Sequence, residues 1–136
     1  MDLLNSLKIA ASGLGAQSHR MRVISENLAN TNSTAVEKGG DPYRRKVPTF
    51  ETEFNREIGG DVVKVGKLKL DQSDFGVRYD PGHPAANDKG YIKTPNVNGL
   101  VEAMDMREAQ RSYEANLNVI TSARRMLAKT LEILKV

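Results

Sequence analysis

The chain has 136 residues and a mass of 15.0 kDa, a length typical of one domain. Its 20 basic and 17 acidic residues nearly balance to a net charge of +3, whereas a dedicated polyanion-binding protein normally has a one-sided basic surface. The chain contains no cysteine, which excludes disulfides, thiolate nucleophiles and zinc–sulfur sites.

The N-terminal region resembles neither a membrane span nor a secretory signal peptide. Its longest uncharged stretch, from Ile9 to Ser18, has 10 residues, while a bilayer span needs about 20 apolar residues. Asp2 precedes Lys8, so the basic region that opens a signal peptide is missing. We therefore expect no direct membrane insertion, and any export would proceed without a cleaved signal peptide.

Residues 1–30 show a seven-residue apolar repeat that predicts a long helix. One row of the repeat is Leu7, Leu14, Met21 and Leu28, and a second row is Leu3, Ala10, Gln17 and Ile24. Gly13 and Gly15 lie in a stretch of small residues where another backbone could approach closely. Asn27, Asn30, Thr31 and Asn32 predict the helix end, because Asn tolerates the left-handed conformation.

Residues 98–136 show the same repeat more strongly and predict a second long helix. Asn98 is a good N-cap residue, and Glu102 lies in the first turn, where the helix dipole favours an acidic side chain. The apolar row consists of Met106, Tyr113, Ile120, Leu127 and Leu134, and Leu117 and Leu131 widen it.

The segment 31–97 contains all five prolines and predicts irregular structure with short strands. The strand candidates are residues 62–70, read as a strand or bent hairpin, then 75–79 and 91–92. The expected fold is mainly α: the helices of residues 1–30 and 98–136 pair as a coiled-coil-like bundle that forms one helical domain. The small β-containing segment lies between them in the sequence.

One stretch could carry chemistry. His83, with Asp80 and Asp88 nearby, could ligate a metal or act as a base in a metal-dependent hydrolase. The alternative, which the surrounding prolines favour, is a rigid turn. Because no phosphate-binding loop, nucleophile elbow or metalloprotease motif occurs, we expect neither an enzyme nor a cofactor or metal site.

Arg44, Arg45 and Lys46 form a basic cluster, flanked by Tyr43 and Phe50. It could bind phosphate in a soluble coiled-coil adaptor or nucleic-acid-binding module. The alternative is a solvated or intersubunit charge cluster, which the balance of 11 basic and 10 acidic residues over positions 31–99 favours. We therefore expect no nucleic-acid partner.

Several motifs resemble those of bacterial flagellar rod and hook proteins, particularly the proximal-rod members. The resemblance covers essentially the whole chain, with an insertion at 32–39. The segments are Ala11–Leu14, Asn27–Thr31, Gly40–Arg45, Tyr79–Ala86, Gly90–Asn98 and Arg111–Asn116. Within them, the residues that match the family motif are Asn27, Ala29, Asn30, Thr31, Tyr43, Arg44, Pro95, Asn96, Asn98, Tyr113, Glu114 and Asn116.

The resemblance implies a non-enzymatic subunit of the flagellar basal body that polymerises into the proximal rod, a drive shaft transmitting torque across the periplasm. Its partners would be further copies of itself, other proximal and distal rod proteins, the adaptor at the MS ring, and the flagellar type III export apparatus. We expect assembly through the apolar helix rows, that is, Leu7, Leu14, Met21, Leu28, Met106, Tyr113, Leu117, Ile120, Leu127 and Leu134.

Overall fold

The structure is a computed structural model that describes residues 3–134, so positions 1–2 and 135–136 of the predicted helical domain lie outside the described residues. The chain divides into two compact units. The described part of the first unit comprises residues 3–21, 49–67 and 107–134, and the second comprises residues 22–48 and 68–106. Each unit therefore contains part of both terminal helices and part of the middle segment.

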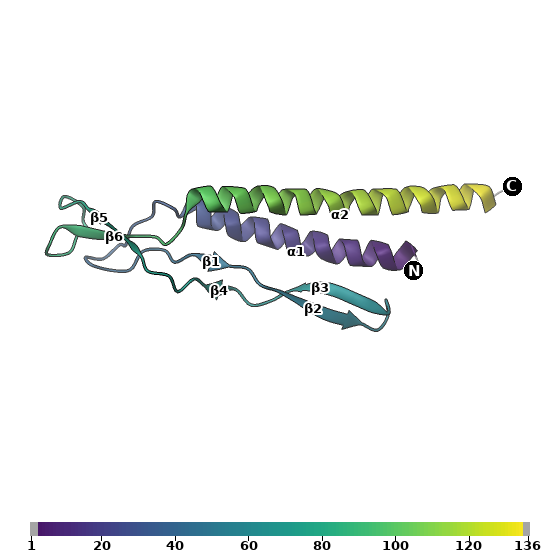
Figure 1. Cartoon of the computed structure of the whole chain (residues 1–136), viewed down its shortest axis with the longest axis horizontal. Helices are drawn as coiled ribbons and strands as arrows, with labels where there is room; N and C mark the ends of the chain where they lie inside the picture. The colour runs from purple at the N-terminus through teal and green to yellow at the C-terminus, as the bar shows by residue number, and fades with distance from the viewer. Residues whose placement is uncertain (1–2, 135–136) are drawn as a thin grey trace. The chain divides into compact units, whose positions relative to one another are not determined.

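Both predicted helices are confirmed, as α1 (Leu3–Ala29) and α2 (Gly99–Leu134), and they pack against each other (Figure 1). In the first unit, Gly13 lies beside Asn116, and Leu3 shares a groove with Met126. In the second unit, Asn27 bonds to Glu102. As residue numbers increase along α1, the numbers of the neighbouring residues on α2 decrease. The helices therefore run antiparallel within each unit.

Small side chains fill the contact between the helices. A Cβ atom added at Gly13 would lie 2.9 Å from the Asn116 side chain, which confirms the close approach expected of the small-residue stretch. The buried apolar residues of the two helices are Ala10, Ala16, Val23, Ile24, Ala109 and Ala123. The larger side chains of the predicted rows are half-buried, except for Ile24, which is buried, and Leu117 and Leu134, which are exposed.

The two helix ends facing the middle segment are capped by side chains. The Oδ1 atom of Asn98 accepts hydrogen bonds from the backbone N–H groups of Leu100 and Val101, which confirms the predicted N-cap. The predicted left-handed stop of α1 is wrong, because no non-glycine residue among residues 3–134 has a positive φ angle. Instead, the Asn30 side chain donates to the Glu26 carbonyl and the Thr31 hydroxyl donates to the Asn27 carbonyl.

Six short strands form three separate two-stranded antiparallel sheets in the described residues. The pairs are β1 (Lys46–Val47) with β4 (Lys69–Leu70), β2 (Phe50–Asn55) with β3 (Gly60–Val65), and β5 (Gly76–Tyr79) with β6 (Tyr91–Thr94). The expectations at 75–79 and 91–92 are confirmed.

Two strand expectations need correction. Residues 62–70 are not one strand or hairpin, because Gly66 ends β3 and β4 pairs with β1 instead. Sequence reasoning also missed β2, whose alternating Phe50–Glu51–Thr52–Glu53–Phe54 pattern is a period-two signal. A partner distant in the sequence decides the first point, since β4 pairs with β1, whereas β2 and β3 form a local hairpin.

The second unit has a small core of its own, formed by Ala85, Ala86 and Ile92 with Ala35 packed against them. The predicted turn at 80–84 is confirmed: the Asp80 carbonyl accepts from the His83 N–H, and the His83 carbonyl accepts from the Ala86 N–H. In the β5–β6 sheet, the exposed rings of Tyr79 and Tyr91 meet edge to face with their centroids 5.2 Å apart.

The helix contact generates a matched pair of glycine predictions. Gly13→Val should lower the free energy of unfolding by about 1–3 kcal/mol, because the new side chain overpacks the contact with Asn116. Gly15→Ala meets nothing within 4 Å and should raise it by up to about 1 kcal/mol through helix propensity. Urea unfolding followed by circular dichroism measures both. Equal effects of the two changes would contradict the close contact at Gly13.

Candidate functional site: a buried polar junction and the exposed helix surfaces

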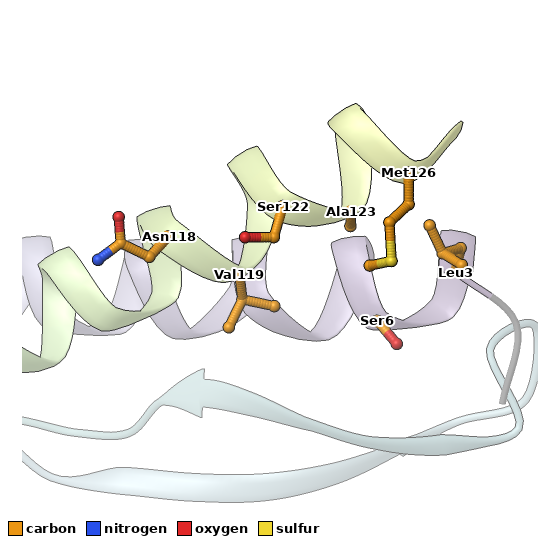
Figure 2. A pocket seen from close by; sticks show the side chains of 7 residues that line it. All are labelled: Leu3, Ser6, Asn118, Val119, Ser122, Ala123 and Met126. Carbon is orange, nitrogen blue, oxygen red and sulfur yellow. The ribbon is translucent and has the colours of Figure 1, made fainter. Parts of the chain in front are cut away.

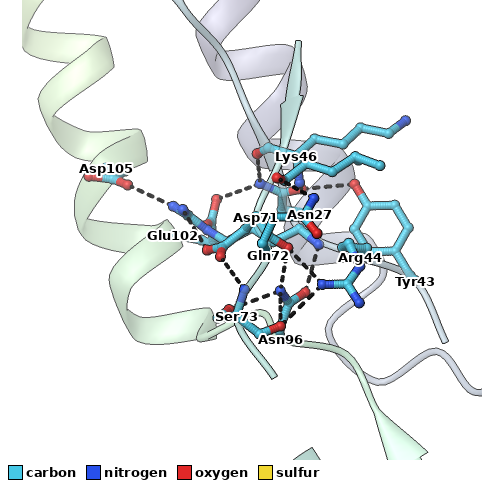
Figure 3. A network of polar contacts seen from close by, with 12 residues as sticks. Asn27, Tyr43, Arg44, Lys46, Asp71, Gln72, Ser73, Asn96, Glu102 and Asp105 are labelled. Carbon is cyan, nitrogen blue, oxygen red and sulfur yellow. Dashed lines mark hydrogen bonds and ion pairs between the residues drawn. The ribbon is translucent and has the colours of Figure 1, made fainter. Parts of the chain in front are cut away.

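A fully buried carboxylate, that of Glu102, lies where the ends of α1 and α2 meet the middle segment in the second unit (Figure 3). It accepts hydrogen bonds from Arg45 Nε at 2.5 Å and from Asn27 Nδ2 at 3.1 Å. A buried carboxylate is costly unless it is paired and hydrogen-bonded, so these two donors are what make the position tolerable.

Asn27 connects α1 to strand β1 through its side-chain amide. Its Nδ2 donates to the Lys46 carbonyl at 2.9 Å, and its Oδ1 accepts from the Lys46 N–H at 3.0 Å. The Oδ1 atom also accepts from the Tyr43 hydroxyl at 2.8 Å. The amide therefore bonds to β1 as a neighbouring strand would, which no apolar side chain could do.

Arg45 joins α2 to the segment around β4. Its guanidinium lies 3.7 Å from the Asp71 carboxylate and 3.5 Å from that of Asp105. Its backbone N–H donates to Asn96 Oδ1, and Asn96 Nδ2 in turn donates to the Asp71 carbonyl. The planar guanidinium can serve several carboxylates at once, which suits this position.

Glu102, Asn27, Arg45 and the residues bonded to them form a polar junction, and two of its groups have shifted pKa values. Burial raises the pKa of Tyr43 to about 12, and the negative charges of Glu26 and Glu102 add to the effect. Hydrogen bonds from the backbone and side chain of Ser73 lower the pKa of Asp71, and the charge of Arg45 contributes further.

The predicted basic cluster has partners within the fold, and reading it as solvated is wrong. Arg45 bonds to Glu102, and Lys46 pairs with Glu26. Arg44 donates to the carbonyls of Asp71 and Ser73 and stacks over the Phe75 ring at 4.2 Å. All three cations therefore already have partners within the chain.

The three residues of the hydrolase alternative are not brought to one site. Asp88 pairs with Lys38 at 2.7 Å, and Asp80 lies 3.6 Å from Arg78. The Nδ1 atom of His83 accepts a hydrogen bond from the Ala85 N–H. No group of three or more potential metal ligands occurs among residues 3–134.

The family-motif residues fall into three places. Asn27, Tyr43, Arg44 and Asn96 belong to the junction, and Asn98 caps α2. Asn30 and Thr31 cap the end of α1, beside exposed Ala29. Buried Pro95 precedes α2, and in the first unit Tyr113 and Asn116 are half-buried while Glu114 is exposed.

Sequence reasoning missed the central residue of the junction. The first-turn position of Glu102 suggests only a helix-dipole role, but the residue also lies seven residues before Ala109, fourteen before Asn116 and twenty-one before Ala123. That spacing places it on the face that packs against α1. A charged residue on such a face could have indicated a buried partner of opposite charge.

The first unit leaves apolar side chains of α2 exposed. The helix continues beyond the position opposite Leu3, and Leu131, Ile133 and Leu134 near its end are 61%, 74% and 73% exposed. The same unit has an open groove of about 420 Å³, whose walls include Leu3, Val119 and Met126 (Figure 2). Exposed apolar patches of this kind mark interaction surfaces.

A second hollow of about 360 Å³ lies between α1 and the β2–β3 sheet in the first unit. Gln17 lines it, and the Oε1 atom of Gln17 is buried without a hydrogen-bond partner. Leaving such an atom unsatisfied costs about 1–3 kcal/mol. Within the described residues, the hollow therefore has one acceptor atom without a donor.

Two protein families match segments of this sequence. A family described as "Flagella basal body rod protein" matches residues 7–35, and "Flagellar basal body rod FlgEFG protein C-terminal" matches residues 88–133. The sequence is 53% identical to the flagellar basal-body rod protein FlgC of Agrobacterium fabrum, over 99% of this chain and 98% of that protein. The chain belongs to the FlgC family of rod proteins.

More distant members of the FlgC family align over nearly the whole chain as well. The FlgC protein of Bacillus subtilis is 41% identical over 98% of this chain and 99% of its own, and that of Salmonella typhimurium is 39% identical over 98% of both. The matched family segments contain Asn27 and Glu102, whereas Arg45, their partner in the junction, lies outside them. No helix within residues 3–134 is long and apolar enough to cross a bilayer.

The junction generates a stability prediction. Arg45→Met should lower the free energy of unfolding by about 3–5 kcal/mol, because it leaves the buried Glu102 carboxylate without its cation. The matched control is Arg78→Met, which removes an exposed ion pair with Asp80 and should cost no more than about 1 kcal/mol. Urea unfolding measures both variants, and similar losses would contradict the importance of the buried pair.

Tyr43 generates a pH prediction. Its pKa is raised to about 12, so the folded state holds this proton more tightly than the unfolded state does. The resulting stabilisation is complete below the ordinary tyrosine pKa of about 10 and is lost as the pH rises to about 12.

The phenolate absorbance of the wild type minus that of Tyr43→Phe, recorded against pH, should show one step centred near pH 12. A step centred near 10 would show that the phenol is not shielded as the junction requires.

Proposed function

We propose that this chain is a structural subunit of the flagellar basal-body rod and that it polymerises through the outer surfaces of its paired terminal helices. The observation that carries this proposal is the similarity to FlgC proteins over nearly the full length of both chains. A rod subunit needs no catalytic centre, and we propose that the chain has no enzymatic activity.

The exposed surface of α2 supports a polymerising function. Within the helix pair, small side chains make the contact, so the larger apolar side chains remain available outside it. Leu117, Met126 and Leu131 are 45%, 52% and 61% exposed. Burying such side chains against neighbouring subunits would contribute about 1.5–3 kcal/mol for each one fully covered.

The helix rows define the assembly surface that we propose. Half-buried Leu7, Leu14, Met21 and Leu28 on α1 would be covered completely only in the polymer. The same holds on α2 for half-buried Met106, Tyr113, Ile120 and Leu127 and for exposed Leu117 and Leu134. Contacts between unlike surfaces of successive subunits, if they do not close into a ring, produce a helical filament.

More specifically, we propose that the chain is a subunit of the proximal rod, where the polymer would transmit torque across the periplasm. We propose that the chain contacts other proximal and distal rod proteins and the adaptor at the MS ring. It would reach this place through the flagellar type III export apparatus, without a cleaved signal peptide. The motifs of the proximal-rod members in segments 79–86 and 90–98 support this assignment.

The buried junction suits a subunit that carries load. Glu102 on α2 is tied to Asn27 on α1 and to Arg45 beside β1. A sideways force on the middle segment of the second unit would therefore pass to both helices through hydrogen bonds protected from water. By contrast, nucleic-acid binding would require Arg44, Arg45 and Lys46 to leave their present partners.

The assembly proposal is tested with Leu131→Asp and Leu117→Asp, produced separately in a strain that lacks the chromosomal gene. Both side chains are exposed, so the isolated subunit should remain folded. In the polymer, the introduced carboxylate would lie in an apolar contact, and rods should fail to form. Electron microscopy of basal bodies and swimming in soft agar give the result.

The matched control is Gln110→Asp, another introduced charge at an exposed position of α2. It should leave rods and swimming near normal. Secretion and urea unfolding of each variant separate an assembly defect from a folding or export defect. Normal rods from both leucine variants would contradict assembly through this helix surface.

A further inference from the structure

The hollow between α1 and the β2–β3 sheet has the form of a socket for a single side chain. Ile9, Gly13 and Ala16 form its wall on α1, and Phe50 and Val63 form its wall on the sheet. The backbone N–H of Val63 donates to the Ser12 hydroxyl at 3.3 Å, which holds the sheet over the helix. Its volume of about 360 Å³ is near the lower limit for ligand pockets, a size that suits one long side chain.

The polar atoms of this socket call for a hydrogen-bond donor. Gln17 Oε1 is buried and unsatisfied, and the Glu51 carboxylate lies in the lining as a second acceptor. Asn116, also in the lining, already donates its Nδ2 to the Ser112 carbonyl. A hollow with apolar walls and two acceptor residues in its lining fits an arginine, whose methylene stem is apolar and whose guanidinium only donates.

The chain carries arginines without partners on α2. Arg107, Arg111 and Arg125 are exposed, and within residues 3–134 they have neither an ion pair nor a side-chain hydrogen bond. At 100° per residue, these three positions share one side of the helix, opposite Ala109 and Ala123. We call this the arginine face of α2.

The arginine face is free to contact a different chain. Ala109 and Ala123 are buried in the contact with α1, so the arginines point away from the socket of their own subunit. The charges of the two surfaces are also complementary. The β2–β3 hairpin carries Glu51, Glu53, Glu57 and Asp61 against Arg56 and Lys64, whereas residues 107–134 of α2 carry an excess of cations.

We propose that the socket of one subunit receives Arg111 or Arg125 from the arginine face of a second copy of this chain. The proposal rests on the proposed function, since it identifies one contact between neighbouring subunits in the rod. Gln17 Oε1 and Glu51 would accept the guanidinium hydrogen bonds, and the apolar walls would cover its stem. The contact would complete a hollow that the single chain leaves open.

Disulfide cross-linking tests the contact directly, because the native chain contains no cysteine. One copy carries Thr52→Cys at the socket, and a second copy, expressed in the same cells, carries Arg111→Cys or Arg125→Cys. After mild oxidation of isolated basal bodies, a dimer that disappears on reduction should form with at least one arginine position. The matched control pairs Thr52→Cys with Asn32→Cys, an exposed position in the other unit, and should give no dimer.

A charge exchange gives a second, independent readout. Arg111→Glu combined with Arg125→Glu should reduce the swimming zone, and adding Glu51→Arg should restore a large part of it. Swimming can be restored in this way only if the two surfaces meet. If the glutamate substitutions acted by destabilising the subunit, Glu51→Arg would not restore swimming. If a cysteine variant prevents rod formation, this exchange decides the question.

The outcomes distinguish this contact from the proposed function. Intact rods with no dimer at either arginine position, or no restoration by Glu51→Arg, would overturn the socket while leaving the rod function standing. A deletion strain that still builds normal rods would overturn the proposed function itself.

Discussion

A carboxylate removed from water, that of Glu102, is the constraint on which the second unit depends. Because it is fully buried, it requires donors, and the chain supplies Arg45 from beside β1 and Asn27 from α1. These donors have their own requirements, which Lys46, Tyr43 and Asn96 meet. One buried charge thereby fixes where the first strand, the end of α1 and the start of α2 lie in this unit.

The small residues between the helices limit the apolar area that this contact buries. Glycine and alanine allow the backbones to approach closely, but they bury little apolar area, so the isolated helix pair gains little from its own contact. Apart from buried Val23 and Ile24, the larger apolar side chains of the helices are half-buried or exposed. A subunit of this kind is stabilised most when neighbours cover those side chains, as in a polymer.

The composition does not show which charged side chains are paired inside the units and which are exposed on their surfaces. The basic cluster 44–46, which looks like a surface for an anion, neutralises carboxylates within the second unit. Arg107, Arg111 and Arg125, which have no partner within residues 3–134, lie instead on α2, and acidic side chains gather on the β2–β3 hairpin of the first unit. Intersubunit electrostatics would therefore depend on these two surfaces and not on the most basic segment of the sequence.

The sequence by itself determined the two helices, the N-cap at Asn98, the proline turn at 80–84 and the rod-protein motifs. Those features depend on contacts between near neighbours, which a local pattern records. Only the tertiary structure decided the partners of Glu102, the separation of β3 from β4 and the socket beside Gln17. The Glu102–Arg45 pair spans 57 positions, and β1 and β4 pair across more than twenty. Hydrogen bonds over such separations depend on how the chain folds back, and no local pattern specifies that.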